Sequence, residues 1–222
     1  MKSKNKKFKR ILIIGGSKGI GNSVYKNIKS LSLETLALSR KDLDTSNPKS
    51  VNDFCTKYKT ADVIFLNSGG PPPKPFREIS NEEWVRYFNQ LFLGFVTILK
   101  KIKIKKNGYI FYLSSSIIKE PDDFLLISSS LRVGFSSLLK SLSKEYSTKK
   151  ISVLNIAPGP FKTRRVESLV KDIKTYEKKL PTGKIGNPDE IGKFVRFVLE
   201  NKIKYLTGST IYFDGNINKG YL

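Results

Sequence analysis

The sequence predicts an α/β fold in which a doubly wound parallel sheet is flanked by helices. Short apolar runs alternate with helical patterns throughout the 222 residues. The runs are rich in β-forming residues, as expected of parallel strands that are buried on both faces. A glycine-rich turn joins the first run to the first helical pattern. Alternation with connections of this length is typical of a doubly wound sheet.

Six strands and five helices are expected along the chain. The strands are expected at residues 11–14, 35–39, 63–66, 109–114, 152–156 and 210–213, and the helices at residues 20–31, 48–58, 81–103, 124–146 and 188–200. Asn47-Pro48 supports the start of the second helix, because it supplies a cap residue and then proline at the first helical position. The interval from Arg40 to Asn47 is too short for a further helix and strand, so the sheet is expected to lack one edge strand. Without internal repeats or a low-complexity linker, residues 1–222 are expected to form a single domain.

The chain is strongly basic, with 41 lysine and arginine residues, 19 aspartate and glutamate residues and a net charge of +22. This balance invites a nucleic-acid interpretation. However, the cations are scattered over nearly every segment, and lysine outnumbers arginine, the better reader of bases and phosphates. A lysine-coated surface is therefore favoured, and no nucleic-acid partner is expected. An acidic partner or substrate, such as a phosphopantetheine carrier protein or a nucleotide-linked sugar, is compatible with the charge.

The rare residue types exclude several classes of site. The chain contains no histidine and only one cysteine, Cys55. A histidine-based triad, a histidine metal site and an internal disulfide are therefore excluded, and no metal site is expected. The longest apolar stretch, residues 91–99, is about half of what a membrane-spanning helix needs. The basic N-terminus lacks the apolar segment of a signal peptide, so no membrane partner and a cytoplasmic location are expected.

The glycine-rich turn predicts a site for a dinucleotide. Gly15 permits a tight turn after the first strand, Gly19 lets the backbone approach a pyrophosphate, and Gly21 lets the helix pack closely on the sheet. The start of the helix then offers free N–H groups and a positive dipole end to the phosphates. A Rossmann-type fold is expected on this basis, with Ser17, Lys18 and Ile20 completing the cofactor-binding turn.

Basic residues beside this turn indicate which dinucleotide is preferred. The second strand is followed by Ser39-Arg40, where an acidic residue would bind a ribose 2′-hydroxyl and an arginine accommodates a 2′-phosphate. Lys18 can reach the same phosphate. Together, Lys18 and Arg40 favour NADP(H) over NAD(H).

The spacing of the three glycines resembles the TGxxxGxG pattern of the short-chain dehydrogenase/reductase family, with Ile14 in place of the threonine. Further segments resemble family motifs from Ile11 to about Asn216. Asp44-Thr45 resembles the segment that contacts the adenine, and Asn67 and Gly69 match two positions of the NNAG motif. Pro158-Gly159 with Thr163 resembles the PG…T segment beside the nicotinamide, and residues 205–216 resemble the terminal strand and turn. The resemblance implies an oxidoreductase that binds its cofactor through these residues. It also implies a homodimer or homotetramer paired through the two long helices, 81–103 and 124–146.

The catalytic positions depart from the Ser–Tyr–Lys set of this family. The family spacing puts Ser115 at the orienting serine, Ser128 at the tyrosine and Arg132 at the lysine. The family's helix asparagine is replaced by Leu91. The resemblance is to a divergent, oxoacyl-carrier-protein reductase-like branch that has GGPPP and lacks YxxxK.

A replacement for the missing acid is expected near the same crevice. A lysine near a cationic cofactor region can have a lowered pKa and donate a proton, so Lys119 is the candidate acid. A solvent-facing Lys119 on a loop is an equal alternative. Arg132 is expected to hold the cofactor ribose, or to pair with an anion, without exchanging protons.

The favoured function is an NADP(H)-dependent oxidoreductase that reduces a carbonyl or oxidises an alcohol by hydride transfer. In this hypothesis Ser115 polarises the carbonyl, and Lys119 or water supplies the proton. The alternative is a catalytically silent nucleotide-binding homologue that acts as a partner or regulatory subunit. A lyase or epimerase with a fixed nucleotide ranks below both. The resemblance places the cationic segment 163–181, which includes Arg164 and Arg165, at the family's variable substrate lid. Its charge hints at a small-molecule or carrier-linked substrate that is anionic, and a charged lid exposed to solvent is the alternative.

Overall fold

A single parallel sheet organises the protein. The computed structural model describes residues 7–220. The sheet contains six strands in the order β2-β1-β3-β4-β5-β6, and every neighbouring pair is parallel. The strands are β1 (Phe8–Ile14), β2 (Ser32–Leu38), β3 (Thr60–Leu66), β4 (Lys103–Leu113), β5 (Ser152–Pro158) and β6 (Ser209–Phe213). Residues 40–47 form turns without a strand, so β2 is the edge, as predicted.

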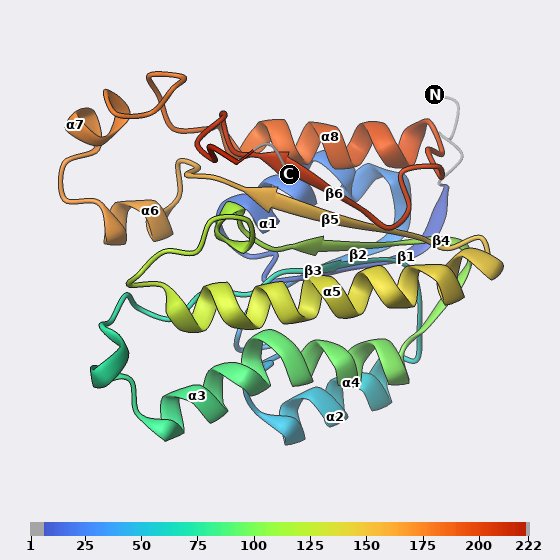
Figure 1. Ribbon diagram of the computed structural model, residues 1–222. Coiled ribbons are helices and arrows are strands. Elements are labelled where there is room, and N and C mark those ends of the chain that lie inside the picture. The colour runs from blue at the N-terminus through green and yellow to red at the C-terminus, as the bar shows by residue number, and fades with distance from the viewer. Residues whose placement is uncertain (1–6, 221–222) are drawn as a thin grey trace.

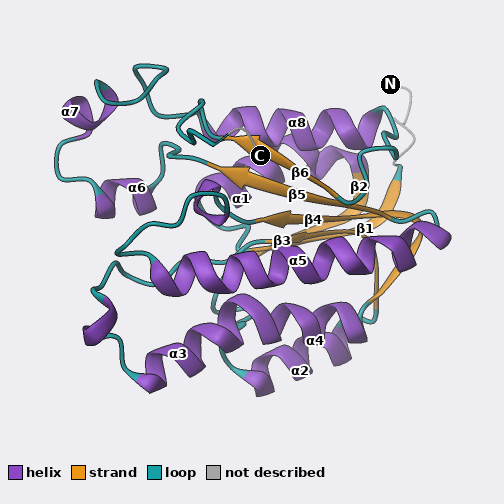
Figure 2. Cartoon of the chain, in the orientation of Figure 1, coloured by secondary structure: helices purple, strands orange, loops and turns teal. Residues whose placement is uncertain are grey.

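Helices cover both faces of this sheet, which confirms the predicted fold class (Figures 1 and 2). Helices α1 and α8 pack together on one face, and α2, α4 and α5 cover the other. The helices are α1 (Gly19–Ile28), α2 (Pro48–Lys57), α3 (Asn81–Phe88), α4 (Gly94–Lys101), α5 (Leu126–Thr148), α6 (Arg164–Leu169), α7 (Ile173–Glu177) and α8 (Pro188–Glu200). Helices α6 and α7 stand apart at the end of the sheet toward which the strands point.

Alternate residues of each strand enter two separate cores because side chains of a strand alternate between its faces. In β1, Leu12 and Ile14 pack toward α2, α4 and α5. Their neighbours Ile11 and Ile13 pack toward α1 and α8. All four are at most 2% exposed. Burial on both faces explains why the strands lack the polar alternation of a half-exposed sheet.

The predicted helix over residues 81–103 is interrupted. Helix α3 begins with a capping box between Ser80 and Glu83, as its sequence allows. A π-helical turn, Asn89–Leu93, separates it from α4, and the next strand already begins at Lys103. Such turns insert an extra residue and are frequent at functional sites. Apolar periodicity does not distinguish them from a continuous helix.

Two short helices in the segment 163–181 were not predicted. Helix α6 has six residues and α7 has five, which is too short to show an apolar period. The longest described helix, α5, has 23 residues, eight of them serines. Within residues 7–220, no helix combines the length and apolarity needed to cross a membrane.

Candidate functional site

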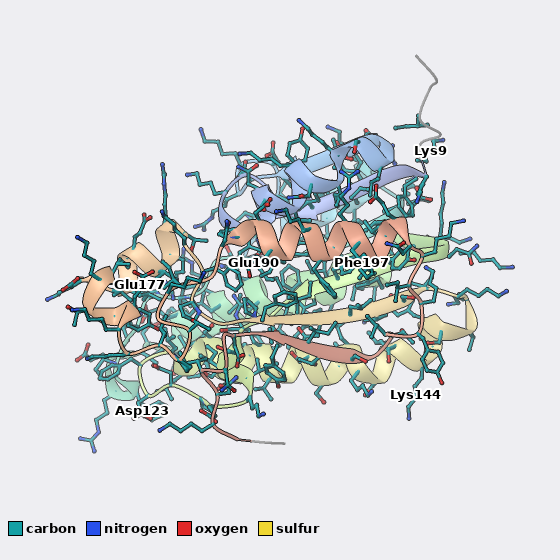
Figure 3. The ribbon with its side chains drawn as sticks, turned by 90° about the horizontal axis from the view of Figure 1, so that it is seen from above. Lys9, Asp123, Lys144, Glu177, Glu190 and Phe197 are labelled. Atoms are coloured by element: carbon teal, nitrogen blue, oxygen red, sulfur yellow. The ribbon has the colours of Figure 1, made fainter. Side chains whose placement is uncertain are left out.

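A cleft of about 1030 Å³ opens at the carboxyl ends of the strands. Parallel strands bring the loops that follow them to one edge of the sheet, where doubly wound folds bind their ligands. Figure 3 shows two labelled residues at this end of the molecule, Glu177 of α7 and Asp123 of the loop before α5. Thirteen of the predicted site residues line the cleft: Gly15, Ser17, Lys18, Gly19, Ile20, Asn67, Gly69, Ser115, Ser128, Arg132, Pro158, Gly159 and Thr163. Gly21, Ser39, Arg40, Asp44 and Lys119 are not part of its lining.

The glycine turn has the tight geometry that its sequence predicts. Gly15 has a φ of +64°, which favours glycine, and a Cβ on Gly21 would lie 2.2 Å from the Gly15 carbonyl oxygen. The Asn67 amide donates to that same oxygen at 3.0 Å and so ties the end of β3 to the turn. Lys18 caps α1 without a side-chain hydrogen bond. The first N–H groups of the helix therefore face the cleft without a capping side chain, as an anion site requires.

The end of β2 lies beside this turn. The Gly16 amide donates to the Leu38 carbonyl at 2.9 Å, which places Ser39 and Arg40 next to the glycines. The Arg40 Nε donates to an Asp44 carboxylate oxygen at 3.0 Å, and the arginine side chain is 62% exposed. Its two terminal nitrogens have no hydrogen bond within residues 7–220. They are the groups that remain for a phosphate.

The two carboxylates that follow β2, those of Asp42 and Asp44, accept hydrogen bonds from neighbouring residues. Ser39 donates through its backbone amide and its hydroxyl to Asp42, and these bonds lower the pKa of Asp42. Burial acts to raise the pKa of Asp44, but hydrogen bonds from Ser46 and Arg40 bring it below its ordinary value. Both groups are therefore ionised at neutral pH.

Arg132 is buried at the floor of the cleft, with 6% of its surface exposed. Its Nε donates to the Ser128 hydroxyl at 3.1 Å, one helical turn earlier on α5. Nη1 donates to the carbonyls of Leu113 and Ser114 at 3.0 and 3.3 Å, and Nη2 to the carbonyl of Ser68 at 3.0 Å. The guanidinium thus joins α5 to the ends of β3 and β4.

Two serine hydroxyls face the cleft from different elements. Ser115 follows β4, is half-buried and has no side-chain hydrogen bond in the described chain. Ser128 accepts from Arg132, and because a guanidinium cannot accept, its own proton is left for another acceptor. Ser114, by contrast, is committed to the Ile156 carbonyl at 3.2 Å.

Lys119 lies outside this arrangement. Its ammonium lies 5.4 Å from the centre of the Tyr212 ring on β6, and the residue does not line the cleft. The structure therefore does not bring the candidate acid together with Ser115 and Ser128. Lysines 18, 26 and 162 are the lysines that line the cleft in the described chain, and no tyrosine does.

The loop after β5 closes the cleft on the side of the glycine turn. The Gly159 amide donates to the Phe213 carbonyl at 2.9 Å, and a Cβ on Gly159 would lie 2.8 Å from the Asp214 Cα. The Thr163 methyl group lies 3.3 Å from the Cβ position of Gly19. Thr163 therefore lies beside the glycine turn, whereas Gly159 packs against the end of β6.

Sequence reasoning missed the place of Arg165. It was expected as one of several cations of the lid segment, whose charge either indicates an anionic substrate or simply faces solvent. Instead, Arg165 is half-buried, lines the cleft and donates through Nη2 to the carbonyl of Pro71. Burial, and then the charge of Arg132, lower its pKa. The only signal in the sequence is the Arg164-Arg165 pair directly after Thr163.

The cleft is electropositive as a whole. Six cations and two carboxylates line it: Lys18, Lys26, Arg132, Lys162, Arg164 and Arg165, with Glu167 and Asp189. Asp189 is paired with Lys193 and accepts from Asn27. No cluster of three or more metal-ligating side chains occurs within residues 7–220.

Known proteins align with most of this chain and share its fold. A family model described as enoyl-(acyl carrier protein) reductase matches residues 29–218. The 3-oxoacyl-(acyl-carrier-protein) reductase FabG of Chlamydia trachomatis is 26% identical over 244 aligned residues, covering 94% of this chain and 97% of that protein.

Two solved structures share the architecture. A short-chain dehydrogenase family protein from Francisella tularensis superposes with a TM-score of 0.83 at 22% identity, covering 93% of this chain and 97% of its own. The L-sorbose reductase of Gluconobacter frateurii, in complex with NADPH and L-sorbose, gives a TM-score of 0.84 at 19% identity and covers 96% and 97% of the two chains. With the family model spanning most of its length, the chain belongs to the short-chain dehydrogenase/reductase family of oxidoreductases.

Proposed function

We propose that the protein is an NADP(H)-dependent reductase or dehydrogenase that interconverts a carbonyl and an alcohol by hydride transfer. The observation that carries this proposal is a shared cleft: the glycine turn at the start of α1 and the hydroxyls of Ser115 and Ser128 line the same space. The Francisella and Gluconobacter proteins share this fold, and the second was solved with NADPH. The FabG relative is named for a 3-oxoacyl substrate.

The residues present fit a dinucleotide phosphate. The pyrophosphate would lie on the amides at the start of α1, where Gly15 and Gly19 have positive φ and carry no Cβ to obstruct it. The free terminal nitrogens of Arg40, with Lys18, would bind the 2′-phosphate. The Asp44 segment is expected at the adenine and the Pro158-Gly159 turn at the nicotinamide.

The chemistry at the other end of the cleft follows from its hydroxyls. When bound, NADPH supplies a hydride to the carbonyl carbon, and the carbonyl oxygen needs a proton. Ser115 and Ser128 donate hydrogen bonds to that oxygen as it becomes negative. Because Lys119 lies against Tyr212 outside the cleft, water is the proposed source of the proton. Arg132 keeps Ser128 oriented for this donation.

Titration with NADPH and NADH tests the cofactor assignment. We expect tighter binding of NADPH, and a loss of about tenfold or more in Arg40→Ala, since a hydrogen bond to a charged group contributes roughly 1.5–3 kcal/mol. NADH binding should change little in the same variant. Arg77→Ala is the matched control, because Arg77 is exposed and has no hydrogen bond or ion pair in the described chain. Equal affinity for the two nucleotides would contradict the NADP(H) preference.

A catalytically silent nucleotide-binding homologue is the second candidate. The absence of tyrosine from the lining of the cleft in the described chain favours it, as does the apolar Leu91 at the family's asparagine position, which is wholly buried. A panel of ketones, oxo acids and acyl thioesters with NADPH separates the two. Turnover that disappears in Ser128→Ala protein supports the enzyme, and tight NADPH binding without any turnover supports the silent homologue.

Self-association is the proposed quaternary state. An apolar strip lies exposed on α3, the π-helical turn and α5, formed by Val85, Phe88, Leu93 and Val133, which are 41–61% exposed. These elements correspond to the two long helices that the family resemblance implies for pairing. A homodimer or homotetramer would cover this strip.

A further inference from the structure

Two guanidinium groups flank one point of the cleft, beside Gly70 and Ser128. A Cβ placed on Gly70 would lie 3.4 Å from Nη2 of Arg165 and 3.5 Å from the Ser128 hydroxyl oxygen. Arg132 donates to that same hydroxyl at 3.1 Å. Burial, and then the nearby charge of Arg132, lower the pKa of Arg165. The two cations therefore converge around Gly70 and Ser128.

Neither cation has an acidic partner. Within residues 7–220, no ion pair with a carboxylate involves Arg132 or Arg165. Arg132 is held by neutral oxygens only, and Arg165 uses one of its five N–H donors, on Pro71. Glu167, the carboxylate of the lining not held by an ion pair, is an exposed residue of α6. A buried and a half-buried charge of the same sign oppose each other unless an anion lies between them.

We propose that Arg165 and Arg132 bind a carboxylate of the substrate beside Ser128, and that the protein acts on oxo acids rather than on neutral ketones or thioesters. This inference rests on the proposed function for the identity of the reacting group. A planar guanidinium matches a carboxylate with two parallel hydrogen bonds, and Arg165 has donors free for both. Ser115 and Ser128 then meet a carbonyl close to that carboxylate.

The cofactor phosphates do not account for this pair. The pyrophosphate site is at the start of α1, where Thr163 approaches Gly19. Arg165 instead donates to Pro71, which follows β3, and Arg165 and Ser128 both lie beside the Cβ position of Gly70. An acyl-carrier thioester would bring a neutral sulfur ester to this point, leaving both cations unpaired. A free oxo acid brings the required charge.

Direct binding distinguishes these substrates without relying on turnover. Calorimetric titration of the full chain, with and without saturating NADP⁺, would compare 3-oxobutanoate, its methyl ester and its N-acetylcysteamine thioester. We expect the acid to bind at least about tenfold more tightly than the ester, which corresponds to about 1.4 kcal/mol. In Arg165→Met the acid and the ester should differ by less than about twofold, and Arg165→Lys should keep part of the preference. Arg77→Met should keep all of it.

The same titrations separate the carboxylate site, its distinctness from the cofactor site, and the proposed function. Equal affinity for the acid and the ester in the unmodified protein, tighter binding of the thioester, or a preference that survives Arg165→Met would each overturn the carboxylate site. An unchanged affinity for NADPH in Arg165→Met supports the site as distinct from that of the cofactor, and a tenfold loss would overturn that distinction. If neither nucleotide binds, the proposed function fails, while the comparison of acid and ester without nucleotide still tests the anion site.

Discussion

At the scale of single residues, the floor of the cleft is built by Arg132. A lysine at this position could exchange a proton, whereas an arginine remains charged and offers a planar set of donors. Its four hydrogen bonds join Ser128 to the ends of two strands. The buried Tyr112 hydroxyl nearby has no hydrogen-bond partner in the described chain, and burial raises its pKa. The charged arginine therefore positions groups that the cleft uses, while Tyr112 stays protonated.

Ser128→Ala should lower kcat much more than it lowers NADPH affinity. The substitution removes a hydroxyl that donates to the carbonyl oxygen, and loss of one such donor typically costs about 10²–10³-fold in kcat. It also leaves the Arg132 Nε without its acceptor. Steady-state kinetics and nucleotide titration on the same preparation give the two numbers.

Lys119→Met tests the original expectation for the acid in the same assay. The ammonium lies against Tyr212 and outside the cleft, so it contacts no reacting group and kcat should change by less than about twofold, which corresponds to roughly 0.5 kcal/mol. A loss comparable with that of Ser128→Ala would restore Lys119 as the proton donor.

Because of Lys204, we predict that part of the free energy of unfolding depends on pH. Burial lowers its pKa from 10.5 to about 8, while two backbone carbonyls and the face of Tyr109 hold the ammonium. Below pH 8 both states are protonated, and the cost of burying the charge is fully present. Between about 8 and 10.5 the unfolded chain holds the proton that the folded chain has lost, so the free energy of unfolding rises with pH.

Comparison with Lys204→Met isolates this contribution, because every other lysine titrates in both proteins. The unmodified protein should gain on the order of 1 kcal/mol relative to the variant between the two pKa values, after allowing for the screening of a half-exposed group. Urea unfolding at a series of pH values measures the difference. A difference that is constant, or that moves the other way with pH, would contradict the lowered pKa.

At the scale of elements, the junction of α3 and α4 brings the start of α4 against the segment that follows β2. Gly94 begins α4, and a Cβ on it would lie 2.4 Å from the carbonyl oxygen of Thr45. The segment that includes Asp44 and Thr45 is therefore supported from behind by the helix. The π-helical turn just before Gly94 sets the helix at the position where this approach occurs.

Gly94→Ala should destabilise the fold and weaken NADPH binding together. The added methyl group must push either α4 or the Thr45 backbone away, and overpacking of this kind costs typically 1–3 kcal/mol. Displacing Thr45 also displaces the neighbouring Asp44 segment. Thermal unfolding and nucleotide titration would report the two effects.

Gly134→Ala is a matched control on α5. Its Cβ would lie 3.4 Å from the Phe92 ring, an ordinary contact, and its φ is not positive. Alanine in a helix is about 0.5–1 kcal/mol more favourable than glycine. We therefore expect a small gain in stability and no change in NADPH affinity. Equal losses in the two variants would show that the Thr45 contact is not responsible.

At the scale of the whole molecule, the exposed apolar strip on α3, the π-helical turn and α5 is the surface through which we propose that the protein self-associates. The rings of Phe88 and Phe92 stack at 5.3 Å and extend the strip toward α5. Phe197 on α8, labelled in Figure 3, is an exposed aromatic residue on the opposite side of the sheet.

Phe88→Glu should shift the protein to a smaller assembly. A carboxylate placed in the centre of an apolar contact is desolvated without a partner and opposes association. Light scattering after size-exclusion chromatography measures the mass of each form. An unmodified protein that is monomeric at micromolar concentration, or a variant with unchanged mass, would contradict pairing through this strip. Lys144→Glu, an exposed change on α5, serves as the control for charge alone.

The sequence by itself determined the sheet, the glycine turn and the absence of one edge strand, because strand burial and turn geometry depend on local residue type. It also determined which residues approach the cofactor cleft from β1, β3, β4 and β5, since parallel strands end at one edge. Only the tertiary structure decided that Lys119 turns toward Tyr212 and that Arg165 turns into the cleft. Those two outcomes depend on how a lid and a loop fold back over the sheet, and no local pattern encodes the direction of a long cationic side chain.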